Sequence, residues 1–75
     1  MTHQDICDAA YVFDQLYTEG RLNFAVEMDL QFFIDVINEE FTVWIRADRV
    51  ESVAWHTYAL FVAHKLKHEG FVNYK

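Results

Sequence analysis

Apolar residues recur with a helical period in three stretches of the chain. In the first stretch they stand three or four residues apart, at Ile6, Ala9, Ala10, Phe13, Leu16 and Tyr17. This spacing is typical of an amphipathic helix. Gly20 follows the last of these residues, where glycine commonly ends a helix as a C-terminal cap. The pattern therefore predicts a first helix from about residue 4 to residue 19.

The second stretch permits two interpretations. It is periodic through Leu22, Val26, Leu30, Phe33, Ile34, Ile37 and Phe41, and either Asn23 or Asp29 is a suitable N-cap. However, apolar residues alternate between Leu22 and Met28, and residues 41–45 are rich in strand formers. An all-α fold is the preferred prediction. An α+β fold with short strands near 22–28 and 41–46 is the alternative.

The third stretch, from about residue 48 to residue 69, carries two apolar stripes. One contains Val50, Val53, Ala54, Thr57, Leu60, Phe61 and His64, and the other contains Trp55, Tyr58, Val62 and Leu66. A helix that is apolar around most of its circumference is central to a fold or lies in an interface. Two flanking helices cover one stripe, so we expect the second stripe to mediate self-association. The prediction is a single small domain, residues 1–75, with three helices and a homodimeric or higher oligomeric state.

The composition indicates which partners and which cellular compartment suit the chain. The chain has 75 residues, of which 53% are hydrophobic, and a lone core of this size supplies only about 3–5 kcal/mol, which favours a partner subunit. The single Cys excludes an internal disulfide and fits a reducing compartment such as the cytoplasm. Neither a signal peptide nor an uncharged run long enough to span a membrane is evident. A net charge of −6 argues against direct binding to nucleic acid.

Candidate catalytic and metal-ligating groups are few. His64 and His68 stand one helical turn apart, as metal-chelating histidines often do, but no further ligands accompany them in a recognised motif. His3 and Cys7 have neither a third residue to orient them nor a Gly-rich turn to form an oxyanion hole. A phosphate-binding loop and a dinucleotide fingerprint are also missing. We therefore predict no enzyme activity, no metal site and no cofactor.

Acidic residues are concentrated in the first part of the chain. Residues 1–45 contain nine Asp and Glu residues and a single basic residue, Arg21. Glu27, Gln31, Asp35 and Glu39 repeat every four residues and would form a ridge on a helix. We predict an acidic partner-binding face made of Asp8, Glu19, Glu27, Asp35 and Glu39. Such a face would suit a protein target with a basic surface and could mimic the charge of nucleic acid. A solvated face that keeps an apolar protein soluble is the other interpretation.

Exposed aromatic residues are the second set of candidate contacts. We expect Tyr11, Phe24 and Trp44 to contribute, because Tyr and Trp often carry the binding energy of interfaces. In composition, though in no motif, the chain resembles small acidic phage and mobile-element proteins that inhibit a host protein. The leading hypothesis is a non-catalytic protein-binding module that inhibits or modulates a target in the host cytoplasm. The alternative is a structural or assembly component that homo-oligomerises through the third helix.

Overall fold

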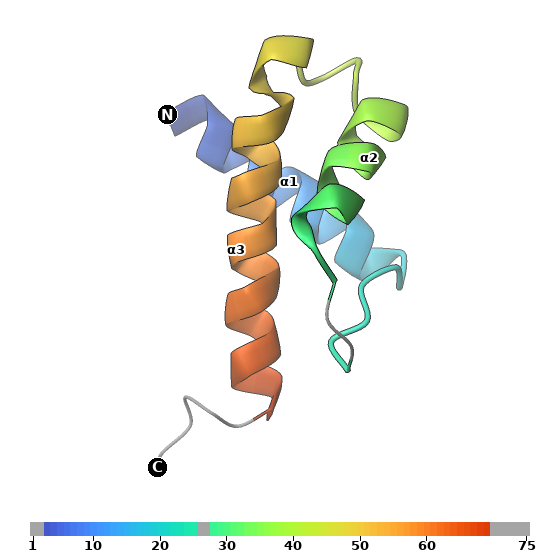
Figure 1. Ribbon diagram of the computed structural model, residues 1–75, viewed down its shortest axis with the longest axis vertical. Helices are drawn as coiled ribbons and strands as arrows, with labels where there is room; N and C mark the ends of the chain where they lie inside the picture. Colours follow the sequence, from blue (N-terminus) through green and yellow to red (C-terminus); the bar gives the residue numbers. More distant parts are fainter. Residues whose placement is uncertain (1–2, 26–27, 70–75) are drawn as a thin grey trace.

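The computed structural model describes residues 3–25 and 28–69, with the backbone alone for residues 68 and 69. In these ranges the chain forms α1 (His3–Thr18), α2 (Leu30–Glu40) and α3 (Val50–Glu69), and the short 3-10 helix η1 (Ala47–Arg49) leads into α3. Figure 1 shows α1 crossing behind the other two helices, and α3 packs against both of them. The prediction of an all-α, three-helix fold is confirmed.

Two of the helix ends follow the predicted capping chemistry. Gly20 has a φ of 70°, and the backbone N–H groups of Gly20 and Arg21 donate to the carbonyls of Tyr17 and Leu16, at 3.1 and 3.0 Å. This bonding pattern is the Schellman motif, in which glycine is favoured because its φ is positive. At the start of α2, the Asp29 side chain accepts a hydrogen bond from the backbone N–H of Phe32. Asp29 is therefore the N-cap.

The alternative prediction of short strands is wrong for the described residues. Asn23 lies in the loop before α2, where its side chain accepts a hydrogen bond from the backbone N–H of Ala25. Residues 41–45 form a turn in which the backbone N–H groups of Trp44 and Ile45 both donate to the carbonyl of Phe41, at 3.0 and 2.9 Å. Burial of Phe41 and Ile45 on the same side of this turn outweighs the strand propensity of the segment. Residues 26 and 27 of the predicted first strand lie outside the described residues.

The hydrophobic core lies where the three helices meet. Its members are Ala9, Val12, Phe13 and Leu16 of α1, Phe33, Val36 and Ile37 of α2, Phe41 and Ile45 of the turn, and Val50, Val53, Ala54 and Phe61 of α3. The buried face of α1 differs from the predicted stripe, since Val12 is fully buried whereas Ile6 and Tyr17 are 47% and 56% exposed. The face is rotated because Asp5, one turn before Ala9, is also drawn inward by polar partners on η1 and α3.

α3 is apolar on its inner face and on much of its outer face. Thr57 is fully buried, and its hydroxyl donates to the carbonyl of Val53 at 2.8 Å, which satisfies the group within the helix. On the outer face, Trp55 is 52% exposed and Leu66 is 37% exposed. Among the described residues, no helix is both long enough and apolar enough to cross a membrane.

Candidate protein-binding surface

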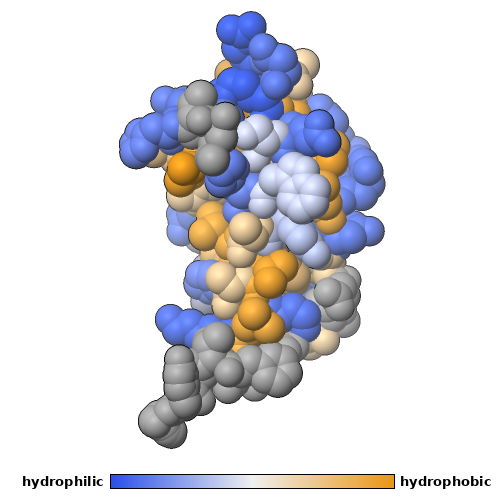
Figure 2. Space-filling model, turned by 60° about the vertical axis from the view of Figure 1, so that its left-hand side comes forward, coloured by the Kyte–Doolittle hydropathy of each residue, from blue (hydrophilic) through white to orange (hydrophobic). Residues whose placement is uncertain are grey.

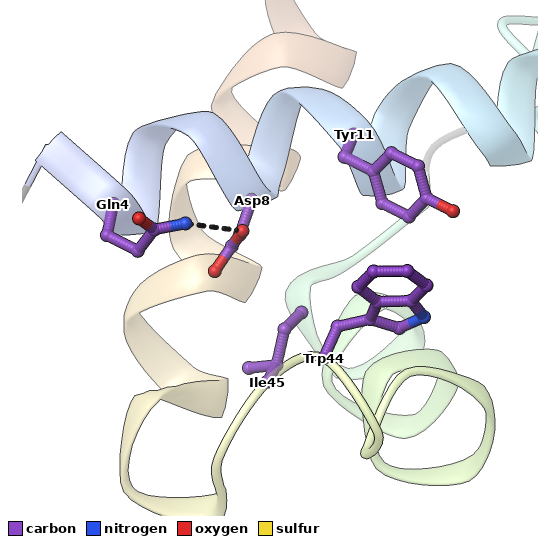
Figure 3. A pocket seen from close by; sticks show the side chains of 5 residues that line it. All are labelled: Gln4, Asp8, Tyr11, Trp44 and Ile45. Carbon is purple, nitrogen blue, oxygen red and sulfur yellow. Dashed lines mark hydrogen bonds between the residues drawn. The ribbon is translucent and has the colours of Figure 1, made fainter.

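A hollow of about 330 Å³ opens between α1 and the turn that follows α2. Figure 3 shows Gln4, Asp8 and Tyr11 on α1 along one side of it, with Ile45 and Trp44 on the turn opposite. The rings of Tyr11 and Trp44 lie beside each other, with centroids 5.5 Å apart and planes inclined at 48°. The structure therefore brings together two of the three predicted aromatic contacts.

The turn explains why Trp44 is held at the surface. Phe41 and Ile45 are buried on either side of it in sequence, whereas Val43 and Trp44 are 90% and 62% exposed. The ring of Tyr11 lies edge-on to Phe41, with centroids 6.2 Å apart, so the buried end of the turn also positions Tyr11. The two aromatic side chains are thus held at the surface by neighbours that belong to the core.

A network of charged and polar side chains holds the first turns of α1 against η1 and α3. Arg49 Nε donates to Asp5 Oδ1 at 2.7 Å, and its Nη2 donates to Asp8 Oδ2. The Ser52 hydroxyl donates to Asp5 Oδ2 at 2.8 Å. The side chains of Asp5 and Asp8 are 7% and 19% exposed, and their hydrogen bonds hold the pKa of Arg49 above its ordinary value. We call Asp5, Asp8, Arg49 and Ser52 the α1 clamp.

The α1 clamp connects the hollow to the rest of the fold. Asp8 belongs to both, because it lines the hollow and accepts hydrogen bonds from Arg49 and from Gln4 Nε2. Sequence reasoning missed the clamp. Asp8 was predicted to belong to an acidic partner-binding face, and Arg49, the partner of Asp5 and Asp8, lies 44 and 41 residues further along the chain. An acidic pair on one face of a helix was the available signal, but it did not identify the partner.

Phe24, the third predicted aromatic contact, lies in a different cluster. Its ring stacks on Phe61, with centroids 5.3 Å apart, and lies 6.1 Å from the ring of Tyr17. His64 packs against the same group, with its ring 4.7 Å from Phe13 and 6.0 Å from Phe24. Phe24 is half-buried and packs against the hydrophobic core beside Phe61.

The predicted acidic residues do not share one surface. Asp8 belongs to the α1 clamp, while Asp35 and Glu39 are exposed on α2, where Gln31 donates to Asp35 at 2.8 Å. Glu19 is exposed and lies 3.5 Å from a guanidinium nitrogen of Arg21. Because α2 begins at Leu30, the ridge on the helix comprises Gln31, Asp35 and Glu39. Glu27 lies outside the described residues.

Arg21 has a stronger partner in Glu40, at the end of α2. Its two terminal nitrogens donate to the two carboxylate oxygens at 2.6 and 2.8 Å. This hydrogen bonding lowers the pKa of Glu40 and raises that of Arg21. The pair connects the loop after α1 to the C-terminal end of α2.

The predicted self-association stripe lies on the outer side of α3. Tyr58 and Val62 are half-buried, and the Tyr58 ring lies 6.1 Å from Phe33 and 6.0 Å from Trp55. Trp55 and Leu66 are therefore the exposed members of the stripe. A second, apolar hollow of about 240 Å³ lies beside it, lined by Ile6, Ala9, Ala10, His56, Ala59 and Leu60. Figure 2 shows apolar side chains through the middle and lower part of one face.

The groups considered for catalysis or metal binding lie on α1 and α3. Cys7 is exposed on α1, and His56 Nδ1 lies 2.8 Å from the carbonyl of Ser52. In residues 3–25 and 28–67 no group of three or more His, Cys, Asp or Glu side chains could hold a metal ion. The side chain of His68 is outside the described part. Comparison with family models, curated proteins and solved structures finds no match for this chain.

Proposed function

We propose that this protein is a non-catalytic protein-binding module whose main contact surface is the hollow between Tyr11 and Trp44. The observation that carries the proposal is the pair of exposed aromatic rings, held together at the surface by a turn whose flanking residues are buried. Tyr and Trp are enriched among residues that dominate binding energy. Exposed apolar side chains that gather in one place commonly mark interaction sites.

The proposed effect of binding is inhibition or modulation of the target. A domain of this size acts on a larger protein most simply by covering part of its surface. The net charge of −6 favours a target with a basic surface, because complementary charge speeds association. The composition is similar to that of phage and mobile-element inhibitors, and an exposed lone thiol at Cys7 is compatible with the cytoplasm.

A matched pair of tryptophan variants tests the contact surface. Trp44 and Trp55 are 62% and 52% exposed, and they lie on different surfaces. The wild type, Trp44→Ala and Trp55→Ala would be used to recover proteins from a host lysate, with folding checked by circular dichroism. We expect one stoichiometric partner that is lost with Trp44→Ala and retained with Trp55→Ala. Equal recovery by the wild type and the folded Trp44→Ala variant would reject the proposed surface.

The acidic residues of α2 provide a separate test of charge mimicry. Replacing Asp35 by Asn and Glu39 by Gln removes two exposed negative charges. Exposed charges contribute at most about 1 kcal/mol each, so the double variant should bind the partner more slowly and with a weaker dependence on salt. Thermal stability should hardly change. Unchanged association rates at low salt would remove these residues from the proposal.

The outer stripe of α3 favours a second candidate function, in which the protein is a structural component that homo-oligomerises. Trp55 and Leu66 are exposed beside the apolar hollow at Ala59 and Leu60, so a second copy could cover a continuous apolar surface. Light scattering at micromolar concentration tests this. A dimer that dissociates on Trp55→Glu would support it, whereas an 8.9 kDa monomer would exclude it.

A further inference from the structure

We infer that the hollow between Tyr11 and Trp44 accepts an arginine side chain of the partner protein. This inference rests on the proposed function, since it names the group that the proposed surface binds. The lining combines two aromatic rings with one carboxylate and an apolar floor formed by Ile45, which is 1% exposed. Aromatic faces attract cations, and a carboxylate accepts their hydrogen bonds.

The charges around the hollow favour a cation. Asp8 is the charged side chain among the five that line the hollow, and the chain as a whole carries a net charge of −6. Each oxygen of Asp8 already accepts one hydrogen bond, from Gln4 and from Arg49. Since a carboxylate oxygen has two lone pairs, each oxygen retains an acceptor position. An incoming donor can therefore bind Asp8 without breaking the clamp.

The shape of the hollow favours one long, planar side chain. Its volume of about 330 Å³ lies near the lower limit of ligand pockets, which span roughly 300–1,000 Å³. A guanidinium group is planar, so it can stack on the Trp44 indole while its N–H groups reach toward Asp8. Lysine offers a compact and more strongly hydrated charge that does not stack in this way. An apolar side chain would remove water from Asp8 without adding a hydrogen bond to its remaining acceptor positions.

The test uses small model compounds and the two tryptophan indole signals of the intact protein. N-acetyl-arginine methylamide, the lysine equivalent and the neutral citrulline equivalent are titrated into ¹⁵N-labelled protein. We expect the arginine compound to shift the Trp44 indole N–H signal saturably, while the Trp55 signal, as internal control, stays in place. Its affinity should exceed that of the citrulline compound by roughly fivefold, the effect of about 1 kcal/mol.

Two variants locate the binding groups. Trp44→Ala should abolish binding, and it leaves the core intact because Trp44 is exposed. Asp8→Asn should weaken arginine binding but not citrulline binding, with folding monitored by the unchanged Trp55 signal. The inference is overturned if lysine or citrulline binds as well as arginine, if Trp55 shifts as much as Trp44, or if Trp44→Ala binds normally. If arginine fails while partner recovery still depends on Trp44, the proposed function stands and this inference alone is rejected.

Discussion

Replacing Asp5 by Asn removes one charge from the α1 clamp while preserving the shape of the side chain. Asp5 accepts hydrogen bonds from Arg49 at 2.7 Å and from Ser52 at 2.8 Å, and its side chain is 7% exposed. Asn keeps one oxygen to accept from Arg49. The Ser52 hydroxyl can turn and accept from the new amide, so both contacts survive in weaker form. The variant therefore measures how much the negative charge of Asp5 contributes to the free energy of unfolding.

The expected loss of stability is about 1.3–2 kcal/mol. A hydrogen bond to a charged group exceeds a neutral one by about 1 kcal/mol. Asp5 also lies in the first turn of α1, where a negative charge stabilises the helix dipole by about 0.3–1 kcal/mol. The change should therefore lower the melting temperature by about 10 °C.

The assay is thermal and urea-induced unfolding at pH 7, followed by circular dichroism. Asp14→Asn is the matched control, because Asp14 is exposed on the same helix, and it should change stability by less than about 0.5 kcal/mol. In an Arg49→Met background, the Asp5→Asn change should cost far less, because the charged partner is gone. If Asp5→Asn lowers stability equally in the wild type and in the Arg49→Met background, the clamp is refuted. It is also refuted if the Asp5→Asn variant is as stable as the Asp14→Asn variant.

Three further changes test the helix ends and the Arg21–Glu40 pair. Asp29→Ala should destabilise the protein by about 1 kcal/mol in urea unfolding, because the N–H of Phe32 loses its cap. Gly20→Ala should also cost about 1 kcal/mol, since an L-residue is strained at a φ of 70° although nothing crowds the site; an unchanged urea midpoint would argue against the Schellman motif. Arg21 lowers the pKa of Glu40 below its ordinary 4.5, so the pair stabilises the fold above that pH and loses its effect as pH falls through the folded-state pKa. The stability difference between wild type and Glu40→Gln, measured by unfolding at pH 7 and pH 3, should therefore shrink at the lower pH.

The amino-acid sequence by itself determined the helices and several of their ends. Helical periodicity and caps act within a few residues, so the positions of α1 and α3 and the capping role of Gly20 could be predicted locally. For α2 the sequence offered two N-cap candidates, Asn23 and Asp29, and the structure selects Asp29. The presence of a second apolar stripe on α3 was also a local property. The prominence of Trp55 at the surface agrees with that pattern.

Tertiary structure decided which faces were buried and which side chains met. Local patterns favoured Ile6 and Tyr17 as core residues of α1, but the helix is turned so that Val12 and Asp5 face inward. The turn at residues 41–45 exists because Phe41 and Ile45 both reach the core, a contact that strand propensity does not register.

The candidate binding surface depends on contacts between distant parts of the chain. Tyr11 and Trp44 were chosen separately as exposed aromatics, and only folding sets their rings 5.5 Å apart. Asp8 joins them because Arg49, 41 residues away, holds α1 against the start of α3. Periodicity reports which side of a helix is apolar. The free energy of packing, summed over all three helices, decides how each helix is rotated and therefore which side chains share a surface.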